Sequence, residues 1–437
     1  MELLSAQRRV NQWMEEQGAH FSVIRQGTRQ VSDRPFDPIQ RTLAGQEFNR
    51  LEQGLIQRVM ALNLFLNDVY HDKMILRDGV IPEEFVFSSP DFRHECMKLT
   101  PVKSIYAHIA ATDLIRSQDG TWYAMEDSFS SPDGLTYTHF ARQLLREADP
   151  GAYDVPGLCD NCGLDILLRQ LYRDIARNTP ALEDGLVVLL VDEDEDDDAF
   201  ELRYLAKLTG AVAATADELT VMDSKLYYHA PEGGFQRVAI LHRMTPDRCL
   251  DPLSYDGVHQ GIPHLMEVYC MGNIAILNAP GCSLAEDRGL YCFVPDMIRY
   301  YLEEEPLLPN VPTYLPWYPD QREFIFSNME HLFFKDVASD RRTAAIRGST
   351  LTAEQRETMK KAIEADPRRF MAQEILSAER LPVLVGESET ADARCDLRLY
   401  TVHSDSIRVW MGGLSRFTLH GEGKADVGFK DTWVLAE

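Results

Sequence analysis

A short apolar run near the middle of the chain constrains the fold more than any other feature. Residues 185–191 read Gly-Leu-Val-Val-Leu-Leu-Val, which is typical of a strand buried on both faces of a parallel sheet. A helical pattern over 199–208 and a second short strand over 211–214 follow it. This β-α-β alternation predicts an open α/β layer in the middle of the chain.

Other patterns add helices and antiparallel strands around this layer. Helices are predicted over 41–70, 164–177, 265–271, 291–304 and 352–365, the last opening with a Thr-x-x-Gln capping box. Strands are predicted over 73–80, 105–115, 121–126, 237–242, 396–402, 406–412, 415–420 and 432–435. The predicted fold class is therefore α/β (α+β), with antiparallel sheet near both ends of the chain.

Charge and composition exclude several classes of function. The chain has 437 residues and a net charge of −25, which argues against a non-specific binder of nucleic acid or anionic membranes, since both would need a basic face. No apolar run reaches the roughly 18 residues that a membrane span needs. The mixed-charge N-terminus does not read as a signal peptide. These features predict a soluble, cytoplasmic protein.

The eight cysteines are too widely spaced for a disulfide framework in a chain of this length. Cys159 and Cys162 form the one close pair, with no second Cys-x-x-Cys and no nearby His-x-x-x-His. We interpret this pair as part of a loop before a helix. Redox or metal chemistry is the alternative.

A predicted hairpin carries the first candidate site. Its strands flank Ser117-Gln118-Asp119-Gly120, whose Asp-Gly step is typical of a tight turn. Counted outward from this turn, Asp113 and Glu126 lie opposite one another on one face, Asp127 points to the other face, and Ser128 returns to the first. Such oxygen ligands suit Mg²⁺ bound together with substrate phosphates. Two solvated surface acids are the alternative interpretation.

Two cations lie on or beside apolar strands further along the chain. Lys335 follows Leu-Phe-Phe, and Arg398 follows Asp396-Leu397. Burial of either cation requires an anionic partner, which is a phosphate or a structural carboxylate. Residues 412–416, Gly-Gly-Leu-Ser-Arg, predict a glycine turn that would allow close approach to a ligand. Neither a P-loop nor a strand-anchored Gly-x-Gly-x-x-Gly occurs, which disfavours P-loop and Rossmann folds.

Longer strings carry a resemblance to a known family. They occupy 57–70, 75–82, 112–137, 242–253, 271–281, 293–314, 366–374, 395–398, 412–417 and 430–435. In these strings the chain resembles the circularly permuted ATP-grasp proteins of the glutathionylspermidine-synthase-like group, nearly from end to end. The resemblance implies a circularly permuted ATP-grasp fold in which an open α/β layer and antiparallel sheets form a nucleotide cleft.

The same resemblance implies an activity. Such proteins join a carboxylate to an amine with ATP and Mg²⁺, through an acylphosphate. The implied partners are therefore small-molecule or peptide carboxylate and amine substrates, with no nucleic acid and no membrane. The oligomeric state and the identity of the substrates stay open.

Residue roles follow from the matched motifs. The metal residues implied are Asp113, Glu126 and Ser128; the nucleotide residues are Lys335, Gln373, Glu374 and Arg288; and the catalytic residues are Arg398, Arg416 and Arg243. The implied organisation is an N-terminal helical region over 1–100, a metal-binding β segment over 101–160, a substrate-side α/β domain over 161–285 and nucleotide-binding lobes over 286–437.

The sequence departs from the family pattern at several places. Ser128 replaces an asparagine, Arg288 replaces a lysine, and residues 340–342 replace a glycine-rich stretch. The glycine-rich loop before Lys-Asp-Thr-Trp is shortened to 425–429. Seven acids at 192–198 follow the central strand, and we interpret them as a solvated loop or as a surface that attracts a cationic substrate.

These departures leave three hypotheses. The first is an active ATP-dependent ligase. The second is a catalytically degenerate relative that binds a nucleotide or a peptide as a partner module. The third is phosphorylation of an acid without ligation.

Overall fold

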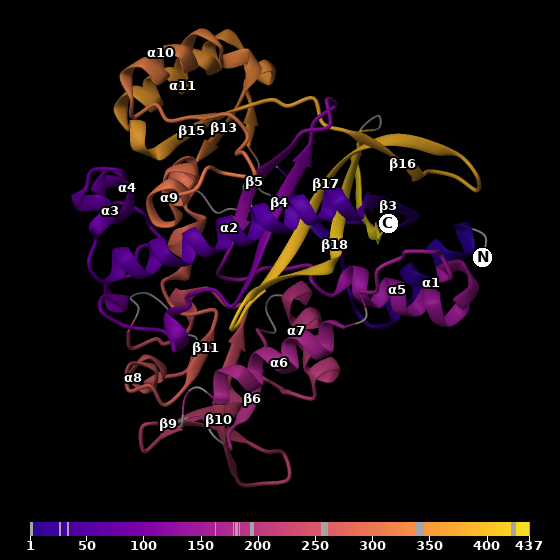
Figure 1. The fold of residues 1–437 in the computed structure, drawn as a ribbon, viewed down its shortest axis with the longest axis vertical. Helices are drawn as coiled ribbons and strands as arrows, with labels where there is room; N and C mark the ends of the chain where they lie inside the picture. Colours follow the sequence, from indigo (N-terminus) through magenta and orange to yellow (C-terminus); the bar gives the residue numbers. More distant parts are fainter. Residues whose placement is uncertain are drawn as a thin grey trace.

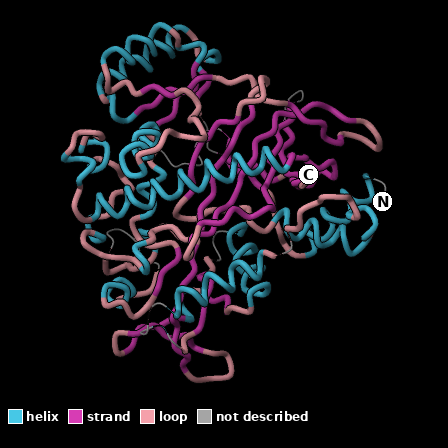
Figure 2. The backbone as a smooth tube through the Cα atoms, in the orientation of Figure 1, coloured by secondary structure: helices cyan, strands magenta, loops and turns pink. Residues whose placement is uncertain are grey.

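The computed structural model describes most of the chain. The described residues are 3–25, 28–32, 35–161, 163–177, 179, 182, 184–192, 196–254, 261–337, 345–420 and 425–436. Cys162, residues 193–195 of the acidic run and residues 340–342 lie outside them. Strands pass through the middle of the molecule with helices around them (Figure 2).

The largest sheet joins the two ends of the chain. Its order is β3-β19-β18-β17-β4-β5, with β16 paired to β17. The strands are β3 (Phe36–Ala44), β4 (Ile109–Arg116), β5 (Trp122–Ser128), β16 (Arg380–Leu384), β17 (Thr390–His403), β18 (Ile407–His420) and β19 (Ala425–Leu435). All neighbours are antiparallel except β3 and β19. Strands from three of the four predicted regions therefore share one sheet.

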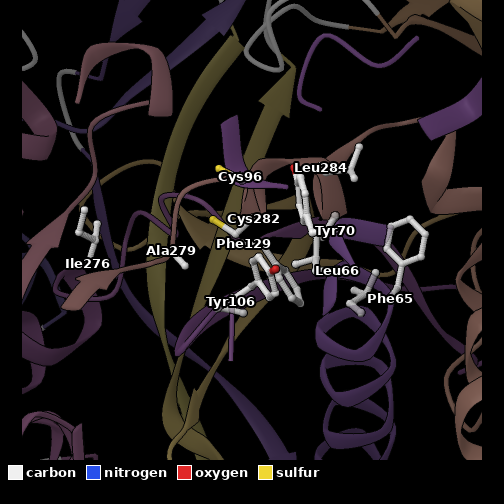
Figure 3. Packing of buried hydrophobic residues seen from close by; sticks show 14 of the residues in the cluster. Phe65, Leu66, Tyr70, Cys96, Tyr106, Phe129, Ile276, Ala279, Cys282 and Leu284 are labelled. Carbon is white, nitrogen blue, oxygen red and sulfur yellow. The ribbon is translucent and has the colours of Figure 1, made fainter. Parts of the chain in front are cut away.

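Helix α2 (Gly45–Tyr70) crosses one face of this sheet (Figure 1). The helical pattern is confirmed, although the helix begins at Gly45 because the preceding residues form β3. Its buried side chains include Phe65 and Leu66, which Figure 3 shows beside Tyr70 and Phe129. Burial of an aliphatic or aromatic side chain contributes about 1.5–3 kcal/mol, so this helix is central to the core.

The predicted α/β layer is confirmed. Strand β6 (Leu186–Leu190) pairs in parallel with β7 (Val212–Ala214) and with β10 (Phe235–Arg243). The further strands of this layer are β8 (Leu219–Met222), β9 (Lys225–His229) and β11 (Ala275–Leu277), and its helices are α6 (Leu164–Arg177), α7 (Asp196–Thr209) and α8 (Leu265–Cys270). The layer lies at the lower end of the molecule in Figure 1.

A separate lobe lies at the upper left of Figure 1, to the side of β4 and β5. It holds a four-stranded sheet in the order β12-β15-β13-β14, covered by two helices. The elements are β12 (Thr313–Tyr314), α10 (Pro319–Ser327), β13 (Leu332–Asp336), β14 (Ile346–Arg347), α11 (Ala353–Ala365) and β15 (Phe370–Glu374). The predicted capping box is present, since Thr352 and Gln355 bond reciprocally at the start of α11.

The remaining elements surround these sheets. They are α1 (Leu3–Glu16), β1 (Ser22–Arg25), β2 (Thr28–Val31), α3 (Met74–Arg77), α4 (Glu83–Phe87), α5 (Tyr137–Ala148) and α9 (Val294–Leu302). Among the described residues no helix combines the length and apolarity that crossing a bilayer requires.

Three expectations about local structure are wrong. The stretch 73–80 contains the short helix α3 rather than a strand, because the Asp68 carboxylate accepts hydrogen bonds from the backbone N–H groups of Met74 and Ile75. Residues 412–416 continue strand β18 instead of turning. A Cβ on Gly412 would lie 2.0 Å from the Trp410 ring, so glycine is required there by close packing. Residues 425–429 are part of β19, not a loop.

Two buried histidines make stability depend on pH. Burial lowers the pKa of His108 and of His242 to about 4. Their unfolded pKa is about 6.5, so the unfolded chain binds protons that the folded chain does not. We expect full stability above pH 6.5 and a loss as pH falls toward 4, at up to about 1.4 kcal/mol per pH unit for each histidine. Urea unfolding at pH 7.5 and pH 5.5 measures this loss, and equal stabilities at both values would contradict it.

Candidate nucleotide and metal site

The β4–β5 hairpin sets two acids against each other. In its register Asp113 pairs with Glu126, and Ala111 pairs with Ser128. The Asp113 side chain is buried, whereas the Glu126 side chain is 31% exposed. The predicted opposition of the two carboxylates is therefore present, and one of them is open to solvent.

The neighbouring acid has a different environment. Asp127 is buried on the α2 side of the hairpin, where both its oxygens accept hydrogen bonds from Arg58 at 2.7–2.9 Å. Burial opposes the positive charge of Arg58, but Asp127 outweighs it and the pKa of Arg58 is raised. Asp127 is thus part of a structural ion pair, as its predicted position on the other face requires.

Two arginines from distant strands hold Asp113. Arg398 on β17 donates from Nε to Oδ1 at 2.6 Å and from Nη2 to Oδ2 at 2.9 Å. Arg416 on β18 lies 2.9 Å from Oδ2 and also donates to Asp396. Burial alone would raise the pKa of Asp113, but these two arginines hold it well below its usual range. Asp113 is therefore a carboxylate anion at neutral pH.

Strand β13 of the neighbouring lobe brings a lysine to the same place. The ammonium group of Lys335 forms no hydrogen bond or ion pair with the described residues. Burial lowers its pKa, while the charges of Glu126 and Asp113 raise it and that of Arg288 lowers it. Arg288 lies 3.8 Å from the Glu126 carboxylate and donates to the Asp336 carbonyl. Lys335 and Arg288 thus add two cations to the surroundings of the acid pair.

A pocket of about 170 Å³ continues from Lys335. Its lining residues are Ile115, Met125, Val311, Phe333, Lys335, Ala345, Gln373, Glu374, Leu376 and Arg394. Met125 reaches it through a β-bulge, because Asp113 pairs with Glu126 while Leu114 pairs with Ala124. Gln373 donates to Thr313 Oγ1 at 3.3 Å, and Glu374 accepts a hydrogen bond from Tyr314 at 2.6 Å. Three of the four predicted nucleotide residues therefore line one cavity.

Two predicted site residues have different surroundings. Ser128 is half-buried beside Ala111 on the hairpin, two residues beyond Glu126. Arg243 is fully buried and donates to Asp247 and to the carbonyls of Thr245 and Asn278. It does not line the Lys335 pocket. These contacts account for its position without a ligand, and its proposed role in the reaction stays a prediction.

A loop that sequence reasoning passed over also reaches the site. Buried Glu286 accepts hydrogen bonds from the backbone of Phe129 and Ser130, and buried Glu201 accepts from Gly134 and Thr136. Asp133, between these two anchors, pairs with Arg398 while its own side chain is 60% exposed. The string Ser-Pro-Asp-Gly reads only as a turn, so no local signal identifies Asp133.

The donor set fits magnesium held jointly with phosphates. Within the described residues no group of three or more His, Cys, Asp or Glu side chains could hold a metal ion alone. Asp113 and Glu126 supply two carboxylates, and Ser128 is a possible third oxygen. Mg²⁺ commonly takes one or two carboxylates and completes its six positions with water and substrate phosphates. The Lys335 ammonium is available to those phosphates.

Comparison with known proteins gives a consistent picture. The sequence model of a family described as circularly permuted ATP-grasp type 2 matches residues 41–418. An uncharacterized Synechocystis protein is 34% identical over 92% of this chain and 84% of its own length. A Frankia casuarinae protein named putative glutamate–cysteine ligase 2-2 is 30% identical over 92% of this chain, but over 47% of its own length.

A solved structure shares the fold at low identity. It is the apo form of a glutathione synthetase-like effector from Globodera pallida. It superposes with a TM-score of 0.60 and 11% identity, covering 99% of this chain and 97% of the effector.

Proposed function

The chain belongs to the circularly permuted ATP-grasp type 2 family, and from this premise we propose that it is an ATP- and Mg²⁺-dependent carboxylate–amine ligase. One observation carries the proposal. Asp113 and Glu126 pair across the hairpin, and the charges of both carboxylates act on Lys335. Lys335 lines a pocket, and its ammonium forms no hydrogen bond or ion pair with the described residues. This is the charge pattern that a magnesium–triphosphate requires.

The charge distribution supports this proposal. The chain carries a net charge of −25, yet Lys335, Arg288, Arg398 and Arg416 gather around the acid pair. Clustered cations in an acidic protein raise the local concentration of a polyanion such as ATP. They would also stabilise the negative charge that develops during phosphoryl transfer.

In the proposed reaction a substrate carboxylate oxygen attacks the γ-phosphorus of ATP, and ADP leaves. An amine then attacks the acyl carbon of the acylphosphate, phosphate leaves with its bonding electrons, and the amine gives up a proton to form the amide. Asp113 and Glu126 would hold Mg²⁺, which supplies charge neutralisation. Lys335 would hold the nucleotide phosphates, and Arg398 and Arg416 would orient Asp113.

A specific observation supports the alternative of a catalytically degenerate nucleotide- or peptide-binding module. Both oxygens of Asp113 already accept hydrogen bonds from arginines, and Ser128 is a neutral ligand where a relative would have an amide. The ligase proposal is nevertheless compatible with these contacts, because a carboxylate has about four lone-pair positions and Asp113 retains capacity for a metal ion.

Trapping with hydroxylamine tests the proposal. The protein is incubated with MgATP, hydroxylamine and a panel of amino acids that includes glutamate, and hydroxamate and ADP are measured. The ligase proposal predicts equal amounts of both products with at least one carboxylate. ATP binding without either product would instead support the partner module, and ADP without hydroxamate would contradict an acylphosphate.

A further inference from the structure

Arg394 is a second cation that lines the pocket of Lys335. Within the described part of the chain its guanidinium forms no hydrogen bond or ion pair. Burial lowers its pKa, Asp396 raises it and Arg347 lowers it. Arg394 is half-buried in the pocket wall. Partial burial of a guanidinium favours an anion or an acceptor beside it, so its unused donors indicate a ligand.

The register of the sheet fixes where this arginine lies relative to the acid pair. Arg394, Asp396 and Arg398 alternate along β17 on one face, and Arg398 lies opposite Asp113. Four residues of strand separate Arg394 from Arg398 by about 13 Å. Arg394 is therefore at the far end of the pocket from the carboxylates that would hold the metal and the terminal phosphates.

Most of the residues that line the pocket are apolar. Ile115 and Met125 from the hairpin, Phe333 from β13 and Leu376 after β15 line the cavity. Its 170 Å³ is below the roughly 300–1,000 Å³ of typical ligand pockets. Such a narrow apolar space suits a flat ring, and the rest of a nucleotide would extend past Lys335 toward Glu126.

We propose that Arg394 binds the base of the nucleotide. This inference rests on the proposed function, and it adds a binding residue that the family resemblance did not supply. Guanidinium is planar and carries only donors, so it can stack on a purine or donate to its ring nitrogens. Lys335 and Arg394 then divide the nucleotide between them, with Lys335 on the phosphates and Arg394 on the base.

Adenosine, which has no phosphate, separates these two roles. Displacement of labelled MgATP by unlabelled adenosine and by unlabelled ATP is measured for the native chain, Arg394→Ala and Lys335→Ala. We expect Arg394→Ala to lower the affinities for adenosine and for ATP by a similar factor, about tenfold. Because the variants also bind labelled MgATP less tightly, the affinity of each variant for labelled MgATP is measured first. The inhibition constants of the two competitors are then corrected with that affinity. Lys335→Ala should weaken ATP and leave adenosine unchanged.

The chain offers a matched control. Arg380 pairs with Arg394 across β16 and β17, is exposed, and donates to the Asp392 carbonyl. Arg380 does not line the pocket. Arg380→Ala therefore removes the same charge next to the pocket without removing a wall residue, and it should leave the affinities for ATP and adenosine unchanged. Arg394→Gln retains much of the side-chain stem and replaces Arg394→Ala if that variant does not fold.

The outcomes distinguish the two proposals. If the Arg394 variant binds ATP less tightly but binds adenosine as the native chain does, base binding is overturned in favour of a long-range effect on the phosphates. Unchanged affinity for both would overturn it as well. In either case, weaker ATP binding in Lys335→Ala would still support the proposed nucleotide site. Failure of the native chain to bind MgATP would overturn both proposals together.

Discussion

Glu126→Gln is expected to abolish the effect of magnesium on ATP binding while leaving the fold intact. The Glu126 carboxylate is partly exposed and its nearest cation, Arg288, is 3.8 Å away. Glutamine keeps the shape and removes the charge that a hard cation needs. With any accepted carboxylate substrate, we expect the rate to fall on the order of 10² to 10³, as when other preorganised charges are removed.

Titration of ATP in the presence of Mg²⁺ and in the presence of EDTA measures this effect. In the native chain ATP should bind more tightly with Mg²⁺, and in Glu126→Gln the two affinities should converge. Thermal unfolding without ligand is the control, and its midpoint should be unchanged. A variant that keeps the full magnesium effect would exclude Glu126 as a metal ligand.

Asp127→Asn is the same chemical change one residue later. It is expected to lower the stability of the fold and to leave the effect of magnesium on ATP binding unchanged. Asp127 is 4% exposed and makes three hydrogen bonds with the equally buried Arg58. Asparagine would leave the Arg58 guanidinium buried without a compensating charge. Breaking one side of a buried pair costs about 3–5 kcal/mol, so this variant should lose stability.

Urea unfolding of Asp127→Asn and Glu126→Gln in parallel provides the measurement, since the two variants differ by one position on the same strand. Where Asp127→Asn remains folded, its dependence of ATP affinity on magnesium should match that of the native chain. A stability equal to that of Glu126→Gln would contradict the structural role of Asp127.

The alternation of side chains along a strand explains why the sequence predicts that Glu126 and Asp127 point to opposite faces of the hairpin. The Asp-Gly turn fixes the register of the hairpin, and adjacent residues on a strand point to opposite faces. In the register that the turn sets, Asp113 would lie opposite Met125, and the bulge at Met125 brings Glu126 opposite Asp113 instead. Alternation beyond the bulge then places Asp127 on the other face, in the core with Arg58. The bulge at Met125 was not predictable, because it depends on how β5 packs rather than on local residue pattern.

The arginine contacts of Asp113 come from pairing between remote segments. Arg398 lies 285 positions along the chain from Asp113, and no local pattern specifies which strands of an antiparallel sheet become neighbours. The family resemblance supplied Lys335, Gln373 and Glu374 as nucleotide residues, and the structure brings them to one pocket. Arg394 was missed because the predicted strand began at 396, whereas β17 begins at Thr390.

The glycines at 412 and 413 illustrate a different limit. A Gly-Gly step reads as a turn when only local sequence is considered. Here each glycine accommodates a side chain that packs on the sheet, Trp410 against Gly412 and Leu399 against Gly413. The same residues therefore extend a 14-residue strand, for a reason that only tertiary packing supplies.

The most direct test of a shared metal and nucleotide site is a crystal structure with Mn²⁺ and a non-hydrolysable ATP analogue. Manganese scatters anomalously and takes the same oxygen ligands as magnesium. We predict one anomalous peak bridging Asp113 and Glu126 and the phosphates, with Lys335 on the triphosphate and the base against Arg394. A nucleotide bound in another cavity, or a metal ion that contacts neither carboxylate, would contradict the site.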